Sequence, residues 1–208
     1  MATRLTRPER KAATRRELLD AARTVFLRRG FHGASLDEIA EEAGYTKGAV
    51  YSNFAGKDDL YLALLQAHYE QRAEAYVAMM RDEASFEEAI HAVGRFMADA
   101  DANEPDWLPT LAEFVAHASR DESLRRSYVG VRERFLAAMA DVIAALCERH
   151  GLALRVPSLE AARASSVLAR GYSAEGRLDP RAVSSDMFVE LHAAFMRGLT
   201  FPKGGVNA

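Results

Sequence analysis

The sequence is short of cysteine, proline and glycine, and it has no long hydrophobic run. Cys147 is the only cysteine among the 208 residues, so neither an intrachain disulfide nor a thiolate metal cluster can form. No apolar stretch approaches the roughly 18 residues that a membrane-spanning helix requires. The N-terminus is basic but lacks the apolar segment of a secretory signal peptide. We therefore expect a globular protein that resides in the cytoplasm.

Signatures of catalysis and of metal binding are also missing. The six histidines are dispersed, without an HExxH motif or a pair four residues apart, so a helix-borne metal site lacks its usual ligands. No GxSxG, Walker or GxGxxG sequence is present. Cys147, beside Leu146 on the apolar side of a long predicted helix, is interpreted as a buried thiol rather than a nucleophile. The sequence predicts neither an enzyme nor a cofactor.

The net charge of −3 hides an uneven distribution of charge along the chain. Residues 1–30 contain nine Lys and Arg against three acidic residues, a charge of +6, so the remaining residues carry −9. A basic end on an acidic chain is typical of a protein that meets nucleic-acid phosphates at that end. A solvated basic tail would have the same composition, so charge alone does not decide between the two.

Helical periodicity runs through the chain, and no segment alternates apolar and polar residues for long. Gly30 and Gly44 each follow the end of a periodic segment, and Ser35 with Glu38 forms a capping box at the start of another. The sequence therefore predicts an all-α protein of about nine helices. They are expected at about residues 12–29, 36–43, 47–53, 57–81, 85–102, 107–119, 121–150, 157–175 and 181–199.

Two of these helices, about 36–43 and 47–53, have the spacing of a helix-turn-helix. Such a pair crosses at a steep angle and needs a small residue in the first helix and a glycine in the turn. Ala40 and Gly44 supply them. At roughly 100° per residue, Val50 and Phe54 define the buried face of the second helix. We expect its opposite face, which is small and polar, to lie in the major groove of DNA; a helical hairpin with an incidental glycine is the alternative.

The residues on or beside the second helix have side chains that suit contacts with DNA. Lys47 can donate to guanine or to a phosphate, Ala49 can meet a thymine methyl group, and Gly48 permits a close approach. Hydroxyl and amide side chains, and backbone N–H groups at helix starts, suit phosphate contacts. The predicted DNA-binding residues are Ser35, Thr46, Lys47, Gly48, Ala49, Tyr51, Ser52, Asn53 and Lys57.

Four stretches of this N-terminal part carry a family resemblance: Phe26–Phe31, Ser35–Ala40, Ala43–Phe54 and Lys57–Leu60. Together they resemble the DNA-binding domain of the tetracycline-repressor (TetR) family. Two residues depart from the usual pattern of that family. Tyr45 stands where a smaller aliphatic residue is usual, and Asn53 stands where histidine or tyrosine is common. The rest of the chain is similar to the family only in length and helix pattern.

The resemblance implies an all-α homodimer whose C-terminal domain binds a small effector. On this basis we expect three parts: a flexible basic arm (1–11), a helix-turn-helix DNA-binding domain (12–60) and an effector-binding and dimerisation domain (61–208). We expect a repressor that binds double-stranded DNA at a near-palindromic operator and is released by its effector.

The last two predicted helices are expected to form the dimer interface. Small residues between their apolar side chains would let two such helix pairs approach as a four-helix interface. A single internal core within one chain is the alternative. The apolar residues concerned are Leu159, Val167, Leu168, Tyr172, Val183, Phe188, Leu191, Phe195 and Leu199.

Aromatic and methionine side chains are frequent in the middle helices, where they suit either a plain core or the wall of an apolar pocket. The resemblance implies that part of this core is hollow and takes an apolar or amphipathic effector. The candidate effector-binding residues are Phe96, Trp107, Phe114, His117, Tyr128, Phe135 and Tyr172.

Two other classes of protein fit parts of the sequence. A small helical enzyme or ligand carrier could use a C-terminal cavity, but no catalytic motif supports it. An architectural DNA-binding protein or a protein-interaction module would explain the helix-turn-helix, but not the long apolar helical remainder.

Overall fold

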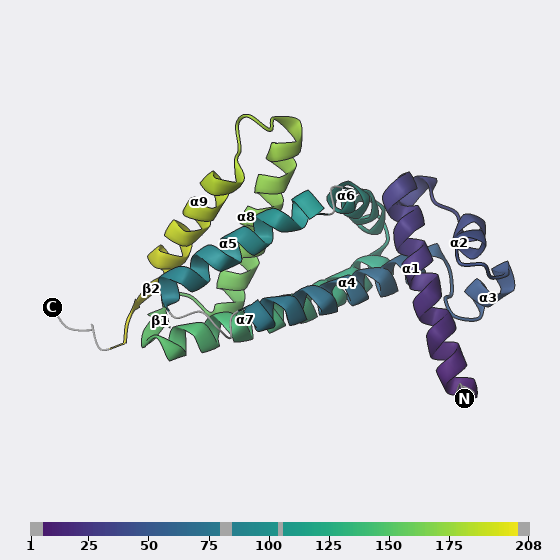
Figure 1. Ribbon diagram of the computed structural model, residues 1–208, viewed down its shortest axis with the longest axis horizontal. Coiled ribbons are helices and arrows are strands. Elements are labelled where there is room, and N and C mark those ends of the chain that lie inside the picture. The colour runs from purple at the N-terminus through teal and green to yellow at the C-terminus, as the bar shows by residue number, and fades with distance from the viewer. Residues whose placement is uncertain (1–5, 80–84, 104–105, 204–208) are drawn as a thin grey trace, which may run out of the picture. The chain divides into compact units, whose positions relative to one another are not determined.

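The structure is a computed structural model that describes residues 6–79, 85–103 and 106–203. These residues form nine helices and two short strands, which confirms the predicted all-α fold (Figure 1). No helix within the described ranges is long and apolar enough to cross a membrane. The elements are α1 (Arg7–Gly33), α2 (Leu36–Glu42), α3 (Lys47–Tyr51), α4 (Lys57–Met79), α5 (Phe86–Asn103), α6 (Trp107–Ala118), α7 (Glu122–Arg149), β1 (Leu152–Leu154), α8 (Ser158–Leu178), α9 (Ser185–Leu199) and β2 (Thr200–Pro202).

The chain forms two compact units. The first comprises the chain up to His68 together with Pro109–Val131, and the second comprises Tyr69–Leu108 and the chain from Arg132 onward. Because α4, α6 and α7 each contribute residues to both units, neither unit is one continuous stretch of sequence. The expected domain boundary after residue 60 falls inside α4 rather than between elements.

Aromatic side chains fill the centre of the first unit. The ring of Phe31, near the end of α1, lies 5.3 Å from that of Tyr61 in α4 and 5.2 Å from that of Phe114 in α6. The ring of Phe26 lies 5.0 Å from the same tyrosine. All four rings are buried, and these three pairs meet edge to face, as the charge distribution of aromatic rings favours. The cluster joins α1, α4 and α6.

Gly30 breaks α1 near its end. Its φ of 72° lies in the left-handed region, and a Cβ atom here would lie 2.6 Å from a carboxylate oxygen of Glu113 in α6. The same carboxylate accepts a hydrogen bond from the backbone N–H of His32 at 3.0 Å. The glycine that was predicted to stop the first helix breaks it, and one further turn follows to Gly33. Glu113 satisfies the N–H group of His32 beside the break.

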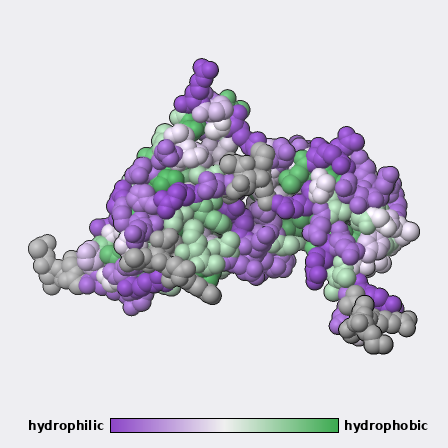
Figure 2. All heavy atoms as spheres, viewed as in Figure 1, coloured by the Kyte–Doolittle hydropathy of each residue, from purple (hydrophilic) through white to green (hydrophobic). Residues whose placement is uncertain are grey.

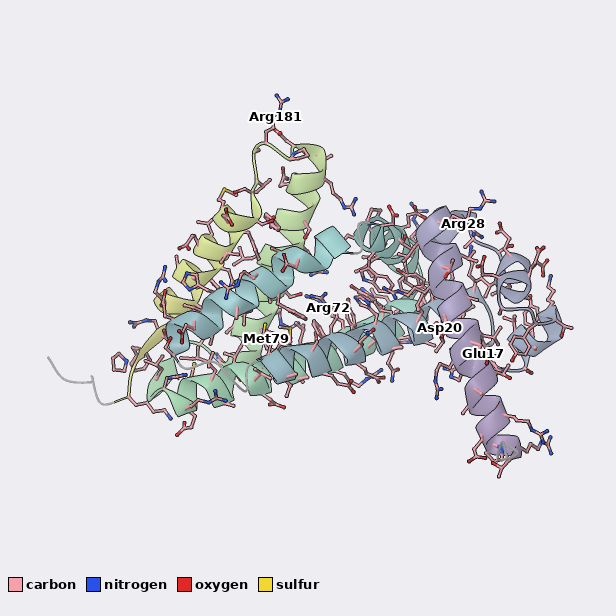
Figure 3. All side chains as sticks on the ribbon, in the orientation of Figure 1. Glu17, Asp20, Arg28, Arg72, Met79 and Arg181 are labelled. Carbon is pink, nitrogen blue, oxygen red and sulfur yellow. The ribbon has the colours of Figure 1, made fainter. Side chains whose placement is uncertain are left out.

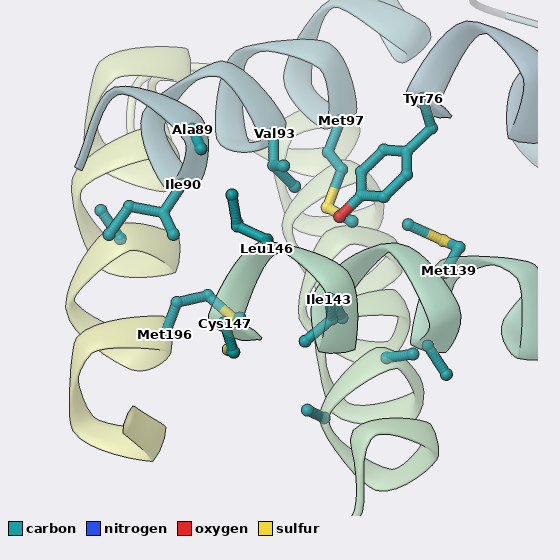
Figure 4. Packing of buried hydrophobic residues seen from close by; sticks show 14 of the residues in the cluster. Tyr76, Ala89, Ile90, Val93, Met97, Met139, Ile143, Leu146, Cys147 and Met196 are labelled. Atoms are coloured by element: carbon teal, nitrogen blue, oxygen red, sulfur yellow. The ribbon is translucent and has the colours of Figure 1, made fainter. Parts of the chain in front are cut away.

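The core of the second unit depends on a close contact between α5 and α9. Gly94 permits it, because a Cβ atom there would lie only 3.1 Å from the backbone of Val189. Figure 4 shows the apolar cluster around this contact, to which α5, α7 and α9 contribute Val93, Leu146 and Met196. A larger residue at position 94 would force the two helices apart.

The first helix begins earlier than the sequence predicted. The backbone N–H of Glu9 donates to the Thr6 hydroxyl at 3.4 Å, the Glu9 carboxylate accepts from the N–H of Thr6 at 2.6 Å, and Pro8 occupies the first turn. This capping box starts α1 at Arg7. The arm that was expected to be flexible over residues 1–11 is therefore helical from Arg7; its residues 1–5, and residues 80–81 of the helix predicted over 57–81, lie outside the described residues.

A two-stranded antiparallel sheet was not predicted. β1 pairs with β2, and Ala153 lies opposite Phe201. Just beyond β1, the backbone N–H of Arg155 donates to the carbonyl of Leu199 at 2.8 Å. Strands of three residues are too short to show a period-two pattern, and their pairing joins segments that are far apart in the sequence. The sheet ties the segment after α7 to the segment after α9.

His192 in α9 is a histidine buried in the core of the second unit. It is 2% exposed, and its Nε2 atom lies 3.3 Å from the Ser165 hydroxyl of α8. Because removal from water disfavours the charged imidazolium, burial lowers the pKa of His192 to about 4. This histidine is neutral in the folded protein at neutral pH.

Acid should therefore destabilise the protein through His192. The unfolded chain takes up a proton near pH 6.5 and the folded chain only near pH 4, so stability rises with pH between these values. We expect the free energy of unfolding to fall by about 2–3 kcal/mol between pH 7 and pH 4.5 because of this residue. Denaturant unfolding of the wild type and of His192→Gln at both pH values should show a smaller fall for the variant. An equal fall in both proteins would contradict a buried neutral histidine.

Candidate nucleic-acid interface

Local backbone and capping interactions set the angle between α2 and α3. The Ser35 hydroxyl accepts from the N–H of Glu38 at 3.2 Å and starts α2, and Thr46 accepts from the N–H of Ala49 at 3.3 Å and starts α3. Between the helices, Gly44 has a φ of 69°, which other residues rarely adopt. The glycine turn and the Ser35–Glu38 capping box are those that the sequence predicted.

The inner side of α3 is anchored by apolar burial, as the helical spacing predicted. Val50 is fully buried, and Phe54, just beyond the helix, is 2% exposed. The Arg15 guanidinium of α1 lies 4.3 Å from the centroid of the Phe54 ring and donates to the carbonyl of Asn53 at 3.2 Å. α1 therefore holds the C-terminal end of α3.

The other end of α3 is also tied to α1. The Tyr45 hydroxyl, just before α3, donates to the carboxylate of Glu17, which is labelled on α1 in Figure 3. The Thr14 hydroxyl donates to the same Tyr45 oxygen at 3.3 Å. The tyrosine that departs from the usual family pattern thus connects the turn to α1 by hydrogen bonds that a smaller aliphatic residue could not make.

The outward side of α3 is exposed and mainly polar, and at Gly48 and Ser52 it projects little beyond the helix backbone. Lys47, Gly48, Tyr51 and Ser52 are exposed, with Tyr51 at 52%, and Ala49 is half-buried on the flank. Short side chains allow the helix backbone to come close to base edges in a major groove, which admits an α-helix. The surface has the form that the sequence predicted, whereas the individual DNA contacts stay predictions.

Lys47 is paired with a residue that the sequence analysis did not single out. Its ammonium lies 2.8 Å from the carboxylate of Asp37 in the first turn of α2, and both side chains are exposed. This hydrogen bond raises the pKa of Lys47. A guanine or phosphate contact by Lys47 must therefore share or displace Asp37. The two residues are ten positions apart on different helices, so helical spacing could not reveal the pair.

Asn53 and Ser52 bind the end of their own helix. The amide of Asn53 donates to the carbonyl of Ala49 at 2.8 Å, and the Ser52 hydroxyl donates to the same carbonyl at 2.8 Å. Both side chains thereby bind the same carbonyl group, which the end of the helix leaves open. A phosphate contact by either one requires a rotation or a second hydrogen bond.

Comparison with known proteins identifies the family of this chain. The sequence model for bacterial regulatory proteins of the tetR family matches residues 18–64. The HTH-type transcriptional regulator TtgW of Pseudomonas putida is 32% identical over 125 residues, which are 59% of this chain and 89% of TtgW. The chain belongs to the tetR family of bacterial regulatory proteins. Since its relatives are transcriptional regulators, the prediction that it is not an enzyme is confirmed.

Other members of the tetR family match shorter parts of the chain. The HTH-type transcriptional activator FasR of Mycolicibacterium smegmatis is 48% identical over 67 residues, 32% of this chain and 29% of FasR. The HTH-type transcriptional repressor AcnR of Corynebacterium diphtheriae is 30% identical over 115 residues, 55% of each chain. The chain thus spans no more than about half the length of these two curated relatives.

Solved structures share the tetR-family fold over almost the whole chain. A TetR transcription regulator from Haloarcula marismortui superposes with a TM-score of 0.73 at 15% identity, over 91% of this chain and all of that one. FadR from Bacillus subtilis, in complex with stearoyl-CoA, superposes with a TM-score of 0.65 at 16% identity, over 92% and 99% of the two chains. At these identities the similarity concerns the fold alone.

Lys57 caps the end of α1 in this tetR-family protein. Its ammonium donates to the carbonyls of Phe31, Ala34 and His32 at 2.9, 3.1 and 3.3 Å, and it lies 4.8 Å from the centroid of the Phe31 ring. An ammonium group has three N–H donors, and three carbonyls already engage them. This bonding makes Lys57 a cap for the end of α1. A phosphate contact by Lys57 stays a prediction, and it requires one of these hydrogen bonds to be exchanged.

The predicted effector-binding residues are divided between the two units. In the first unit, Phe114 and Tyr128 are buried, with ring centroids 6.0 Å apart, and Nε2 of His117 lies 3.2 Å from the carboxylate of Asp58. These three side chains already contact other residues of the first unit, and a role for them in effector binding stays a prediction.

In the second unit the predicted residues pack mainly on other aromatic rings. The Phe135 ring stacks on that of Tyr69 at 4.7 Å, and the Tyr172 ring stacks on that of Phe188 at 4.4 Å. The Arg72 guanidinium lies 4.9 Å from the centroid of the Phe96 ring, and Trp107 is buried. An effector site at these residues stays a prediction.

Replacing Lys57 should lower stability rather than change the salt dependence of DNA binding. In Lys57→Met the carbonyls at the end of α1 lose a charged donor, so we expect the free energy of unfolding to fall by about 2–4 kcal/mol. Lys203→Met is the matched control, because Lys203 forms an exposed ion pair with Glu148 and its loss should cost less than about 1 kcal/mol. Thermal and denaturant unfolding measure both. A Lys57 variant with wild-type stability would contradict the capping role, and a smaller salt slope of DNA binding would support the predicted phosphate contact.

Proposed function

We propose that this protein is a homodimeric transcriptional regulator that binds double-stranded DNA through α3. The observation that carries the proposal is a capped helix that is anchored underneath by Val50 and Phe54. Its exposed outer side combines the short Gly48 and Ser52 with the longer Lys47 and Tyr51. Residues 12–60 supply this DNA-binding part. A helix end and the surrounding hydroxyl groups suit phosphates, whereas base edges are reached from the outer side of α3.

Each residue of the surface has a proposed role. Lys47 donates to a guanine, Asp37 limits its attraction to other sites, and Ala49 contacts a thymine methyl group. Gly48 permits close approach, and Ser35, Thr46 and Tyr51 contact phosphates together with backbone N–H groups. Because few long donors are available, selectivity depends also on the shape of the DNA.

The outer sides of α8 and α9 support dimerisation. Val167 and Leu191 are 54% and 60% exposed, and Leu178 and Met187 on the same two helices are also exposed. A group of exposed apolar side chains, unlike a single one, marks an interaction surface. Of the residues predicted for this interface, Phe188 is buried in the core of its own unit and is not available to a partner. Small or apolar residues recur at spacings of three and four along both outer sides: Ala164, Val167, Gly171, Ala174 and Leu178 in α8, and Met187, Leu191, Ala194 and Gly198 in α9.

A dimer of this kind reads two half-sites of a near-palindrome, one turn of DNA or about 34–36 Å apart. The second unit binds a small effector, and FadR from Bacillus subtilis, a structural neighbour, was solved with stearoyl-CoA. We propose an apolar or amphipathic effector that favours a conformation with lower affinity for DNA, so that DNA must weaken effector binding equally. We propose that the protein represses transcription, because a dimer bound at a promoter blocks access to it without contacting any other protein. Among the relatives, AcnR is named a repressor and FasR an activator.

Tyr51 tests the DNA-binding surface. The full-length protein should select a duplex with an inverted repeat from a randomised DNA library. Tyr51→Ala should bind that duplex about tenfold more weakly, since a hydrogen bond to a charged phosphate is lost. Tyr51→Phe separates the hydroxyl from the ring, and unfolding experiments check that both variants remain folded. Selection of no duplex, or unchanged affinity of Tyr51→Ala at constant salt, would count against α3 as the recognition helix.

Val167 and Leu191 test the dimer. Replacing both by Asp places charges on the outer sides of α8 and α9, and we expect a monomer at micromolar concentration in sedimentation experiments. Val129→Asp is the matched control, because Val129 is an apolar residue on α7 with 43% exposure. The control should remain dimeric. A wild-type monomer at the same concentration would refute the two-half-site arrangement.

A further inference from the structure

We propose that the first three turns of α1, residues 6–16, form a second DNA-contacting element, a preformed cationic helix that binds phosphates beside the base pairs read by α3. The proposal rests on the DNA-binding function proposed above and extends the contact surface beyond the helix-turn-helix. It replaces the flexible arm expected from the sequence by a rigid element of defined direction.

Two contacts show which side of α1 faces α3. Thr14 binds Tyr45 just before α3, and Arg15 binds Asn53 just after it. At roughly 100° per residue, Arg7 and Arg10 lie within about 40° of Thr14, and Lys11 lies between Thr14 and Arg15. At about 1.5 Å per residue, Arg10 lies about 6 Å and Arg7 about 10 Å beyond Thr14 along the helix. These three cations therefore lie on the same side of α1 as its contacts with α3, but nearer the N-terminus of the helix.

The three cations are available for an external partner. Arg7, Arg10 and Lys11 are exposed, and within the described part of the chain no ion pair involves them. The one acidic residue of this segment, Glu9, is occupied by the capping box with Thr6. Figure 2 shows that hydrophilic residues are frequent on the visible face of the protein.

The composition of the segment selects nucleic-acid phosphate as the partner. Residues 6–16 contain five Lys and Arg, one acidic residue and no large apolar side chain. A helix that binds a membrane or a groove on another protein needs an apolar side, which this one lacks. Duplex DNA carries one charge per about 1.7 Å of its axis, so several phosphates lie within reach of a cationic helix beside the groove that α3 enters.

The helix is also ordered before it binds. The capping box at Thr6 and Pro8 in the first turn fix its start, and Leu18 and Ala22 of the same helix are fully buried further along. A flexible arm would lose backbone freedom when it ordered on DNA, whereas this segment has lost it on folding.

Neutralising these cations tests the proposal. The probe is the duplex that the wild-type protein selects from a randomised library, made with and without about five flanking base pairs at each end. The triple variant Arg7→Gln, Arg10→Gln, Lys11→Gln should bind the longer duplex about tenfold more weakly or worse, and its salt slope should be smaller by about two to three. The wild type should prefer the longer duplex, and the triple variant should bind both alike.

Arg16 supplies a matched control on the same helix. It is exposed but lies roughly 160° around the helix axis from Thr14, on the far side of α1 from α3. Arg10→Gln should therefore weaken binding several-fold more than Arg16→Gln, although both remove one charge. Equal effects of these two substitutions, or a triple variant with wild-type affinity and salt slope, would overturn the proposal. If the wild type selects no duplex at all, the proposed function itself fails.

Thr6→Ala separates a preformed helix from a merely charged tail, because it leaves the net charge unchanged and removes the cap. We expect it to lower helicity slightly and to weaken binding of the longer duplex by about two- to fivefold. Circular dichroism and the same binding assay measure both effects. Lower helicity with unchanged affinity would show that the helical form is not needed and would overturn that part of the proposal.

Discussion

The position of α3 is the constraint on which the proposed recognition surface depends. A helix of five residues is too short to be stable by itself, so its orientation must come from its surroundings. Burial of Val50 and Phe54 fixes its depth, and α1 holds both ends, through Tyr45 before it and the Asn53 carbonyl after it. A displacement of α1 would therefore move the recognition surface with it.

At the C-terminal end of α1, two charged side chains bind backbone groups of opposite polarity. The Lys57 ammonium satisfies carbonyls, and the Glu113 carboxylate satisfies the N–H of His32 beside the break at Gly30. A cation suits the carbonyl end of a helix and a carboxylate suits free N–H groups. α4 and α6 thus determine where α1 ends, and α1 determines where α3 lies.

The outer side of α3 is suited to selectivity more than to affinity for DNA. Its short side chains allow close approach, and its single cation, Lys47, is already paired with Asp37. Strong attraction to DNA must then come from elsewhere, and the exposed cations at the start of α1 are placed to supply it without reading bases. Selectivity remains with the fit of α3 to the groove and with the shape of the DNA.

The sequence by itself determined the number of helices, the capping box of α2 and the buried side of α3, because periodicity, capping boxes and glycine turns are local signals that need no partner. The start of α1 was missed, although the Thr6–Glu9 capping box is also a local signal. It also marked the small polar outer side of α3 and the basic N-terminal end. Only the tertiary structure decided what distant residues do: it engaged Lys57 at the end of α1, paired Lys47 with Asp37 and joined β1 to β2. Such contacts depend on which elements meet in space, and spacing along one helix carries no information about them.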